Sequence, residues 1–503
     1  MNDFIMLSDM ITEFDAVVVG GGPVGLWVAC ELALAQLKVA VLERRTERVT
    51  QSRALTIHGR TLEVFALRGI VDRFLSLGRR VPNFHFGALG TRIDFSTLDT
   101  RYPFALFLPQ ATTEGLLEDY ALELGVDIRR GHLVGTVESH VDRVVIGGET
   151  DATPFRVFAR YVVGADGARS IVRRAAQIDF VGYPARQTMM LADVVLDAPP
   201  EHPVATIVNE AGGLVLAPRG YGDHYRIGLV DASMPHVDPG EPVSLAELAS
   251  SAARIAGTDF RPRDPIWLSR FTDETRIAEQ YRKGRILLAG DAAHIHAPMG
   301  GQGMNVGIQD AMNLGWKLAS VLRGTAPEKL LDTYERERLP VGKALRDDTL
   351  AQLALFSRFD PPMLALRRLL ENVLLVPEVN RQFAEQLSGF GVAYPEPLFQ
   401  ADNSWEHQKG VSGQRLRDMD LTLENGSRTT LYRLLEDGRW VRLQLAPNPE
   451  SVPDASGINF VSLATGTNDP LIDNFASVLV RPDGYLAHVR RVDGASNGEN
   501  AGR

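Results

Sequence analysis

A short strand, a glycine-rich loop and a helix follow one another near the N-terminus. The apolar residues 14–19 run into Gly20-Gly21-Gly22-Pro23-Val24-Gly25, which has the spacing G-x-G-x-x-G, and residues 26–34 have the pattern of a helix. A second apolar strand, residues 38–42, ends at Glu43. In this setting the glycines permit a tight turn and close approach to a pyrophosphate, and an acid about 20 residues on can bind ribose hydroxyls. The segment predicts a Rossmann-type dinucleotide site, because a turn that only packs a helix on a sheet would not need Glu43 at that distance.

A second motif lies much later in the chain. The apolar residues 285–289 have the pattern of a strand. They are followed by Gly290-Asp291-Ala292-Ala293-His294, which places Asp291 at the carboxyl end of that strand. A Pro/Gly loop from Pro298 to Gly303 then turns the chain, and residues 305–319 have the pattern of a helix. This order brings a carboxylate to sugar-like hydroxyls and points free backbone N–H groups at an anion. A reduced flavin carries its negative charge at one edge of the ring, so the segment predicts a flavin-binding loop.

A third motif, Asp166-Gly167, follows the apolar strand 161–164 and precedes the basic segment 169–174. Asp-Gly is also a common hairpin turn, so alone it indicates little. Its place between the other two motifs favours a part in the same nucleotide site.

The composition is that of a globular protein with several domains. A chain of 503 residues is too long for one small core, and 45% hydrophobic with 23% charged residues is ordinary. The net charge of −10 does not indicate the basic surface that binds nucleic acid, and no apolar run is long enough to span a membrane. The N-terminus lacks the pattern of a signal peptide, so we expect a cytoplasmic protein. The single cysteine, Cys30, excludes an intrachain disulfide, a thiolate zinc cluster and a flavin–disulfide mechanism.

Strand and helix signals divide the chain into four expected segments. The first nucleotide-binding part is followed by short alternating strands, which indicate an inserted antiparallel sheet. The chain then returns to the nucleotide-binding part with several helices, and it ends in a small α/β domain. The expected boundaries are 12–182, 183–270, 271–395 and 396–503. Pro340 is expected to divide one stretch into two helices, 330–339 and 341–355.

With these three motifs in this order, the sequence resembles the class A flavoprotein monooxygenases, the aromatic hydroxylases related to para-hydroxybenzoate hydroxylase. The segments 332–338 and 480–484 resemble the branch with a C-terminal thioredoxin-like domain, which includes polyketide tailoring hydroxylases and rifampicin monooxygenase. The resemblance implies an α/β fold in which a Rossmann-like FAD-binding domain carries an inserted antiparallel-sheet substrate domain. It also implies a C-terminal thioredoxin-like α/β domain, here without redox cysteines.

The resemblance further implies which residues hold FAD. At the nucleotide end these are Gly20, Gly22, Pro23, Val24 and Gly25 for the pyrophosphate, Glu43 with Arg44 for the adenosine ribose, and the backbone near Val134 for the adenine. Towards the flavin they are Arg53, Gln110, Asp166 and Asp291, of which Asp166 also serves NAD(P)H and Asp291 binds the ribityl chain. Beside the isoalloxazine they are Pro298, Gly301, Gly303, Met304 and Asn305, with the N–H groups of Met304 and Asn305 facing the pyrimidine edge.

The implied reaction is hydroxylation of a phenolic or polycyclic, polyketide-type aromatic through a C4a-hydroperoxyflavin. NADPH or NADH acts as a transient co-substrate, and O2 is the oxidant. The cofactor performs the difficult step, so the protein orients the ring, stabilises the reduced flavin and excludes water. Open alternatives are Baeyer–Villiger insertion, inactivation of a rifamycin-like antibiotic, and a catalytically silent flavoprotein that binds a natural product. The expected partners are the small aromatic substrate and O2, without nucleic acid or membrane, in a monomer or homodimer.

A few polar side chains allow two interpretations. His294 and His296 are spaced like a metal-binding pair, but no cysteine or third histidine lies near them in sequence, so we expect them to brace the flavin loop and expect no metal. His224 and Arg226 fall on an expected strand of the inserted sheet and are substrate-side candidates. A solvated position is the simpler interpretation for both.

Overall fold

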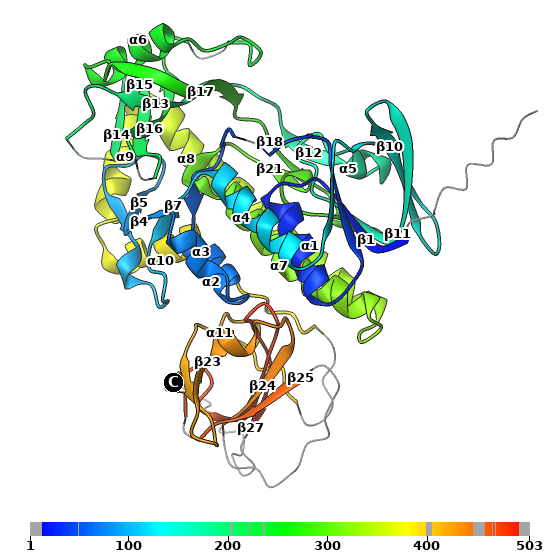
Figure 1. Cartoon of the computed structure of the whole chain (residues 1–503). Helices are drawn as coiled ribbons and strands as arrows, with labels where there is room; N and C mark the ends of the chain where they lie inside the picture. Colours follow the sequence, from blue (N-terminus) through cyan, green and yellow to red (C-terminus); the bar gives the residue numbers. More distant parts are fainter. Residues whose placement is uncertain are drawn as a thin grey trace, which may run out of the picture.

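The computed structural model of the protein describes residues 13–48, 50–201, 204–220, 222–234, 237–398, 405–445, 458–464, 466–467 and 469–491. Figure 1 shows three parts: a central layered nucleotide-binding part, an antiparallel sheet at its upper left, and a C-terminal α/β domain below α2. Residue 12 and residues 492–503, which belong to the expected outer segments, lie outside the described residues.

The central part is built on an eight-stranded sheet. Strand β1 (Glu13–Val19) lies between β2 (Val39–Glu43) and β11 (Thr153–Gly164) and is parallel to both. Strand β20 (Ile286–Leu288) continues the sheet beyond β11, and β8 (Asp127–Arg130) continues it beyond β2, again in parallel. Because the carboxyl ends of parallel strands share one edge, the loops after β1, β11 and β20 meet there.

Backbone hydrogen bonds confirm that the three sequence motifs come together. The Ala165 N–H donates to the Val19 carbonyl at 2.9 Å, and the Ala289 N–H donates to the Gly164 carbonyl at 3.0 Å. The rest of the sheet is the hairpin of β9 (Leu133–Ser139) and β10 (Val144–Thr150), and the edge strand β19 (Arg282–Lys283).

Helices cover this sheet and fix its loops. Helix α1 (Pro23–Leu34) follows β1 and packs against both α4 (Gln110–Glu123) and α7 (Gly303–Leu322). It is apolar on all sides, and Trp27 is fully buried, as expected for a helix between other layers. The shorter helices are α2 (Gly59–Ala66), α3 (Val71–Leu75) and α5 (Ile171–Ala175).

The inserted antiparallel sheet is confirmed. Its strand order is β14-β15-β16-β13-β17, with every neighbouring pair antiparallel. The strands are β13 (Thr188–Leu196), β14 (Ala205–Asn209), β15 (Gly212–Pro218), β16 (His224–Asp231) and β17 (Pro262–Thr272). Helix α6 (Leu245–Ala256) covers one face, against alternate residues such as Met190, Ala192 and Val194. The other face meets the central part.

The predicted break at Pro340 is wrong. A single helix, α8 (Asp332–Ser357), runs through this residue. Proline removes one helix hydrogen bond and crowds the preceding turn, which costs about 3 kcal/mol. Here buried residues lie on both sides of it, Arg338 before and Leu345 and Thr349 after, so tertiary packing outweighs that cost. Two more helices follow, α9 (Pro361–Val373) and α10 (Pro377–Ser388).

The C-terminal domain contains a four-stranded mixed sheet in the order β25-β24-β26-β27. Its strands are β24 (Trp440–Gln444), β25 (Ile458–Ser462), β26 (Phe475–Val480) and β27 (Leu486–Arg491), preceded by β22 (Asp420–Thr422), β23 (Arg428–Thr430) and α11 (Leu431–Leu434). Only β24 and β25 run parallel. This order with these directions is that of a thioredoxin-like sheet, as expected.

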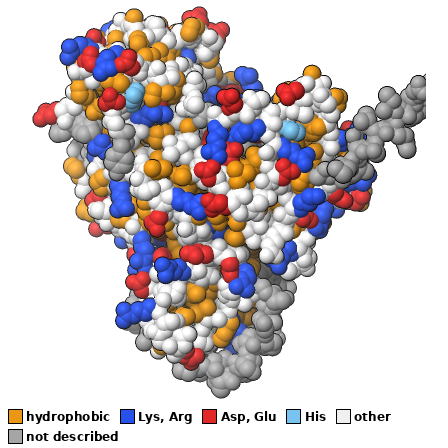
Figure 2. All heavy atoms as spheres, viewed as in Figure 1, with side chains coloured by type: hydrophobic (Ala, Val, Ile, Leu, Met, Phe, Trp, Pro, Cys, Tyr) orange, Lys and Arg blue, Asp and Glu red, His pale blue; other side chains and the backbone are white. Residues whose placement is uncertain are grey.

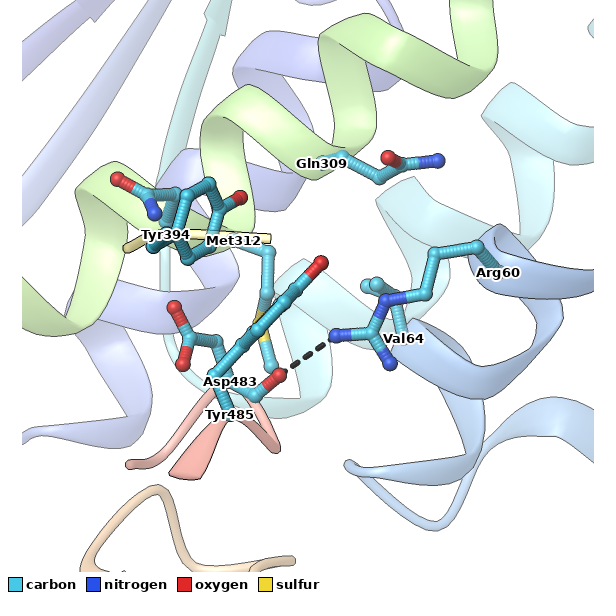
Figure 3. Close-up of a pocket in the computed structure, with 8 residues that line it drawn as sticks. Arg60, Val64, Gln309, Met312, Tyr394, Asp483 and Tyr485 are labelled. Carbon is cyan, nitrogen blue, oxygen red and sulfur yellow. Dashed lines mark hydrogen bonds between the residues drawn. The ribbon is translucent and has the colours of Figure 1, made fainter. Parts of the chain in front are cut away.

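The turn between β26 and β27 enters the central part. The Arg481 guanidinium donates to Glu337 on α8 at 2.9 and 3.0 Å, and Trp316 on α7 donates to the Asp483 carboxylate at 3.0 Å. Arg60 on α2 donates to the Asp483 carbonyl at 2.6 Å, the bond drawn in Figure 3, beside a small polar cavity that Tyr394 and Tyr485 also line. The C-terminal domain is therefore an integral part of the core.

The remaining strands are short: β3 (Thr56–Ile57), β4 (Arg79–Val81), β5 (Asn83–His85), β6 (Arg92–Asp94), β7 (Ala105–Phe107), β12 (Phe180–Tyr183), β18 (Thr275–Ala278) and β21 (His294–Ile295). Figure 2 shows basic and acidic side chains interspersed over the face in view. None of the described helices is long and apolar enough to cross a membrane.

Candidate active site

The glycine-rich loop after β1 has two glycines that the fold requires and one that it does not. Gly20 has a φ of +108°, and a Cβ there would lie 2.3 Å from the Ala165 carbonyl oxygen. A Cβ on Gly25 would lie 2.0 Å from the Gly20 oxygen. A Cβ on Gly22 would meet no protein atom within 4 Å. Gly22 therefore borders open space at the start of α1, where the sequence predicts a pyrophosphate.

The start of α1 is arranged for an anion. Gly22 is the N-cap and has no side chain to cap the helix, and Pro23 occupies the first turn without an N–H of its own. The other N–H groups of a first turn lack helical acceptors and point outward along the axis. The Val24 side chain packs closely against Gly290 and Gly307, where an added Cβ would lie 2.9 and 2.6 Å from it. The pyrophosphate loop and the Asp291 segment are thus in direct contact.

Glu43, at the end of β2, is buried and already oriented. One carboxylate oxygen accepts the Gly21 N–H at 2.7 Å, and the other accepts the Arg45 N–H at 2.9 Å. Each oxygen retains a lone pair for a ribose hydroxyl. The neighbouring Arg44 side chain is exposed. Contacts of Glu43 and Arg44 with a ribose stay predictions.

Asp291 follows β20 and is the clearest open ligand group. Its side chain is exposed and accepts no hydrogen bond from the residues that the structure describes. Burial among surrounding atoms raises the pKa of Asp291, and the charges of His294 and Arg53 counteract this. The carboxylate is thus surrounded by protein atoms yet reachable from solvent. It is placed to accept hydrogen bonds from a bound hydroxyl chain.

The loop before α7 is held by the side chain of Asn305. Its side-chain amide donates to the Thr56 carbonyl at 2.9 Å and to the Gly301 carbonyl at 2.8 Å. Its side-chain oxygen accepts the backbone N–H of His58 at 2.8 Å. Gly301 needs its φ of +63° for the turn. Because α7 begins at Gly303, the N–H groups of Gly303, Met304 and Asn305 lie in its first turn, without helical acceptors. These groups can stabilise a negative ligand edge; Pro298, before the turn, is exposed.

Two side chains shape the segment that carries Arg53. The Gln110 carbonyl oxygen accepts the Ala54 N–H at 3.0 Å, at the start of α4. Arg226 on β16 donates to the Arg53 carbonyl at 2.7 Å and to the Ser52 carbonyl at 2.5 Å. The Arg53 side chain itself is exposed. The segment is thus clamped by its backbone while the guanidinium of Arg53 stays free to reach a ligand.

Arg226 is buried in this structure and holds the backbone of the Arg53 segment. Besides the two carbonyls, it forms a bidentate ion pair with Asp193 at 2.8 and 2.9 Å, and Trp267 also donates to Asp193 at 2.9 Å. The simpler sequence interpretation, a solvated position, is therefore wrong for Arg226. Its contact with a substrate stays a prediction. His224 is half-buried, 3.1 Å from the exposed Asp223.

The other candidates lie along the same edge of the sheet. One Asp166 oxygen accepts the Ile171 N–H at 2.7 Å, whereas the other is buried without a partner among the described residues. Burial raises the pKa of Asp166, and hydrogen bonds from Ser170 and the backbone oppose this. Val134 is buried on β9 and paired with Gly148.

Sequence reasoning missed two buried polar residues near the site. Asp193 is fully buried on β13, and Asp310 is fully buried on α7. His58 is also buried, donates its ring Nε2–H to the Gly300 carbonyl at 2.8 Å, and has its pKa lowered to about 4 by burial. A lone acid within the apolar run 189–196 was a signal for Asp193, since such a charge needs a partner. The only signal for Asp310 was its place in the segment that follows the Asp291 motif.

These features fit FAD. Gly22 leaves room for a phosphate at a helix N-terminus, and Asp291 offers an unpaired carboxylate to a polyhydroxyl chain. The first turn of α7 offers N–H groups to the negative edge of a reduced flavin. Gly22 follows β1 and Asp291 follows β20, so both lie at the carboxyl edge of one sheet, and Val24 of α1 packs against both Gly290 and Gly307 of α7.

Comparison with known proteins agrees. Residues 13–349 match the FAD binding domain family, and residues 409–501 match the aromatic-ring hydroxylase C-terminal domain. The 12-dehydrotetracycline 5-monooxygenase/anhydrotetracycline 6-monooxygenase of Streptomyces rimosus is 39% identical over 488 residues, which cover 94% of this chain and 95% of the relative. The rifampicin monooxygenase of Streptomyces venezuelae is 40% identical over 486 residues, with coverage of 94% and 95%.

A solved structure gives the same result. The anhydrotetracycline hydroxylase OxyS from Streptomyces rimosus superposes with a TM-score of 0.85 at 38% identity, covering 97% of both chains. The fold and the site define a flavoprotein that binds FAD. The chain belongs to the family of FAD-dependent aromatic-ring monooxygenases.

Asp291 provides a first test. We expect Asp291→Asn to weaken FAD binding about 10- to 100-fold, because hydrogen bonds to a charged acceptor contribute roughly 1.5–3 kcal/mol. Fluorescence titration of the apoprotein with FAD measures this. Asp142→Asn, an exposed carboxylate in a hairpin turn, is the control and should bind FAD like the wild type. Equal affinity in both variants would show that Asp291 does not contact the cofactor.

Proposed function

We propose that the protein hydroxylates a large, largely uncharged phenolic aromatic of the polycyclic polyketide type, with FAD as cofactor, NADPH or NADH as reductant, and O2. The observation that carries this proposal is the character of the inserted sheet on its inner face. That face packs against the flavin loop at Ala297 and Met299, and against α8 at Leu353 and Phe356. A substrate next to the flavin would therefore contact this face of the sheet.

The inner face is apolar and is only partly covered by the central part. Residues alternate between the two faces of a strand, so Met190, Ala192 and Val194 face α6, whereas Met189 and Leu191 face inward. The facing strands contribute Val215, Gly228 and Phe271 in the same way. Leu191, Val215, Gly228 and Phe271 are only half-buried. A Cβ on Gly228 would meet only the Leu191 side chain, at 3.4 Å.

The ionic groups on this face already engage one another. Asp193 forms ion pairs with both Arg226 and Arg219, each at 2.8 Å, and Arg226 also donates to the carbonyls of Ser52 and Arg53, so the one positive charge in excess is held by hydrogen bonds within the protein. A small ionic substrate such as a carboxylated phenol would need a free buried counter-charge to offset its desolvation. A broad apolar surface with few polar groups instead favours a large aromatic ring system. The tetracycline and rifampicin relatives, by their names, act on molecules of that kind.

Each part of the chain has a defined task in this proposal. Bound FAD supplies the redox and oxygen chemistry. Gly22 and α1 hold its phosphates, Asp291 holds its ribityl chain, and the N-terminus of α7 stabilises negative charge on the ring. The apolar inner face orients the substrate ring and keeps water away from it.

A substrate panel tests this proposal. We expect NADPH or NADH oxidation by the FAD-loaded protein to rise at least about tenfold with at least one tetracyclic, angucyclic, anthraquinone or rifamycin compound. Small carboxylated phenols should have little effect. The products, identified by mass, should carry one added oxygen. Stimulation by small carboxylated phenols alone would contradict the proposed substrate class, and tight ligand binding without stimulation would indicate a binding protein.

A further inference from the structure

We propose that Asp310, on α7, positions Asp291 for the cofactor by holding Gly290, just before it, and His294, three residues after it. This inference rests on the proposed assignment of Asp291 to the FAD ribityl chain. Asp310 does not touch that chain itself, so it is a positioning residue. This role gives a reason for a fully buried carboxylate within α7, the helix whose N-terminus is proposed to face the flavin.

The contacts of Asp310 converge on the Asp291 segment. One Asp310 oxygen is 2.7 Å from His294 Nε2 and accepts the Gly290 N–H at 3.3 Å. Gly290 immediately precedes Asp291, and His294 lies three residues after it. Both contacts reach the same oxygen, so one carboxylate fixes both ends of this turn. The arrangement sets the direction in which the Asp291 side chain leaves the backbone.

The second Asp310 oxygen is anchored separately. It accepts from Arg338 Nε on α8 at 2.6 Å, and Arg338 also donates to the Tyr394 hydroxyl at 3.0 Å and to the Val306 carbonyl at 3.1 Å. Arg338 and Asp310 are both fully buried. Burial alone would raise the pKa of Asp310, but the charges of Arg338 and His294 lower it, so the carboxylate is ionised. An ionised, doubly anchored carboxylate is a rigid support.

Asp291 is supported through the turn that carries it, because no neighbour in the described part of the chain holds its own side chain. Its carboxylate has no partner among the described residues, so its position depends on its backbone. Arg173 donates to the Ala292 carbonyl at 2.8 Å and holds the turn from the opposite side. Asp310 is therefore the polar group that links the ribityl aspartate to α7. Together with the apolar contact of Val24 with Gly290 and Gly307, it fixes the Asp291 turn relative to this helix.

The test compares Asp310→Asn with a matched control on the same pair of helices. Glu337 on α8 is buried like Asp310 and pairs with Lys317 of α7 at 2.8 Å, but it makes no contact with the Asp291 segment. We expect both Asp310→Asn and Glu337→Gln to lower the melting temperature of the apoprotein. Only Asp310→Asn should also weaken FAD binding, by roughly 10- to 100-fold, because the charge-assisted bonds to Gly290 and His294 are lost.

The outcomes separate this inference from the proposed function. If the wild type binds FAD and Asp310→Asn binds it as tightly as Glu337→Gln does, Asp310 is only structural and the inference is wrong. If the wild type does not bind FAD, the proposed function itself fails. Should Asp310→Asn not fold, His294→Asn removes one arm and leaves the Asp310–Arg338 pair; it should weaken FAD binding in the same direction. Unchanged affinity in that variant would also overturn the inference.

Discussion

Replacing Gly22 with valine is expected to leave the apoprotein folded and to reduce its affinity for FAD by more than about 100-fold. Gly22 has an ordinary φ of −80°, and a Cβ there meets no protein atom within 4 Å. A side chain would instead fill the space in which a pyrophosphate approaches the N-terminus of α1. Gly22→Ala should give an intermediate affinity. FAD titration and the melting temperature of the apoprotein measure the two effects separately.

Gly25 is the appropriate comparison. A Cβ there would lie 2.0 Å from the Gly20 oxygen, so Gly25→Ala is expected to lower the melting temperature of the apoprotein as well as its affinity for FAD. A Gly22→Val protein that retains normal FAD affinity would contradict the placement of the pyrophosphate at this loop.

Arg481→Met is expected to cost about 3–5 kcal/mol of stability, the usual consequence of removing one partner from a buried ion network. Arg481 is 2% exposed and forms ion pairs with both Glu337 and Asp483. Without it, two carboxylates stay buried at the junction of the C-terminal domain with α7 and α8. Trp316, which contacts Asp483 and lies edge-to-face with Trp440 at 5.3 Å, makes urea unfolding followed by tryptophan fluorescence a direct probe of this junction.

The same network gives the sign of a pH effect. Burial opposes ionisation of Glu337, but Arg481 and Lys317 lower its pKa to about 2. A lowered carboxylate pKa stabilises the folded state above the unfolded value, about 4.3, and this contribution is lost as the pH falls from there towards 2. Wild-type stability should therefore fall over that interval, and Arg481→Met should show a smaller change.

A more exposed ion network across the interface of the C-terminal domain is the control. Arg101, with its side chain 42% exposed, pairs with Asp418 at 2.8 Å and with the exposed Asp420 at 2.5 Å. Arg101→Gln should cost no more than about 1 kcal/mol, because solvent screens such pairs. Equal losses in Arg101→Gln and Arg481→Met would mean that the buried network does not hold the domains together.

The sequence predicted that the three motif loops meet, but it did not predict the buried residues that hold these loops in place. Three loops with glycines and acids at fixed spacing predict a shared sheet edge, because parallel strands can place such loops only there. The continuous helix through Pro340 could not be predicted, because the buried residues on either side of it come from packing rather than local propensity. The clamp formed by Arg226 and Asp193 needed the register of β13 and β16, which pairs these two residues directly. The role of Asp310 could not be predicted, because its contact with His294 depends on how α7 packs against the Asp291 segment.

The protein is expected to use FAD to place one atom of O2 on an aromatic substrate. The direct measurement is turnover under 18O2 with NADPH or NADH and the compound that most stimulates oxidation, followed by product mass and location of the label. We expect one labelled oxygen on a ring carbon, dependent on added FAD. Label inserted into a ring C–C bond would instead assign a Baeyer–Villiger reaction. A product that forms without labelled oxygen, or that forms equally well without FAD, would contradict FAD-dependent oxygenation by this protein.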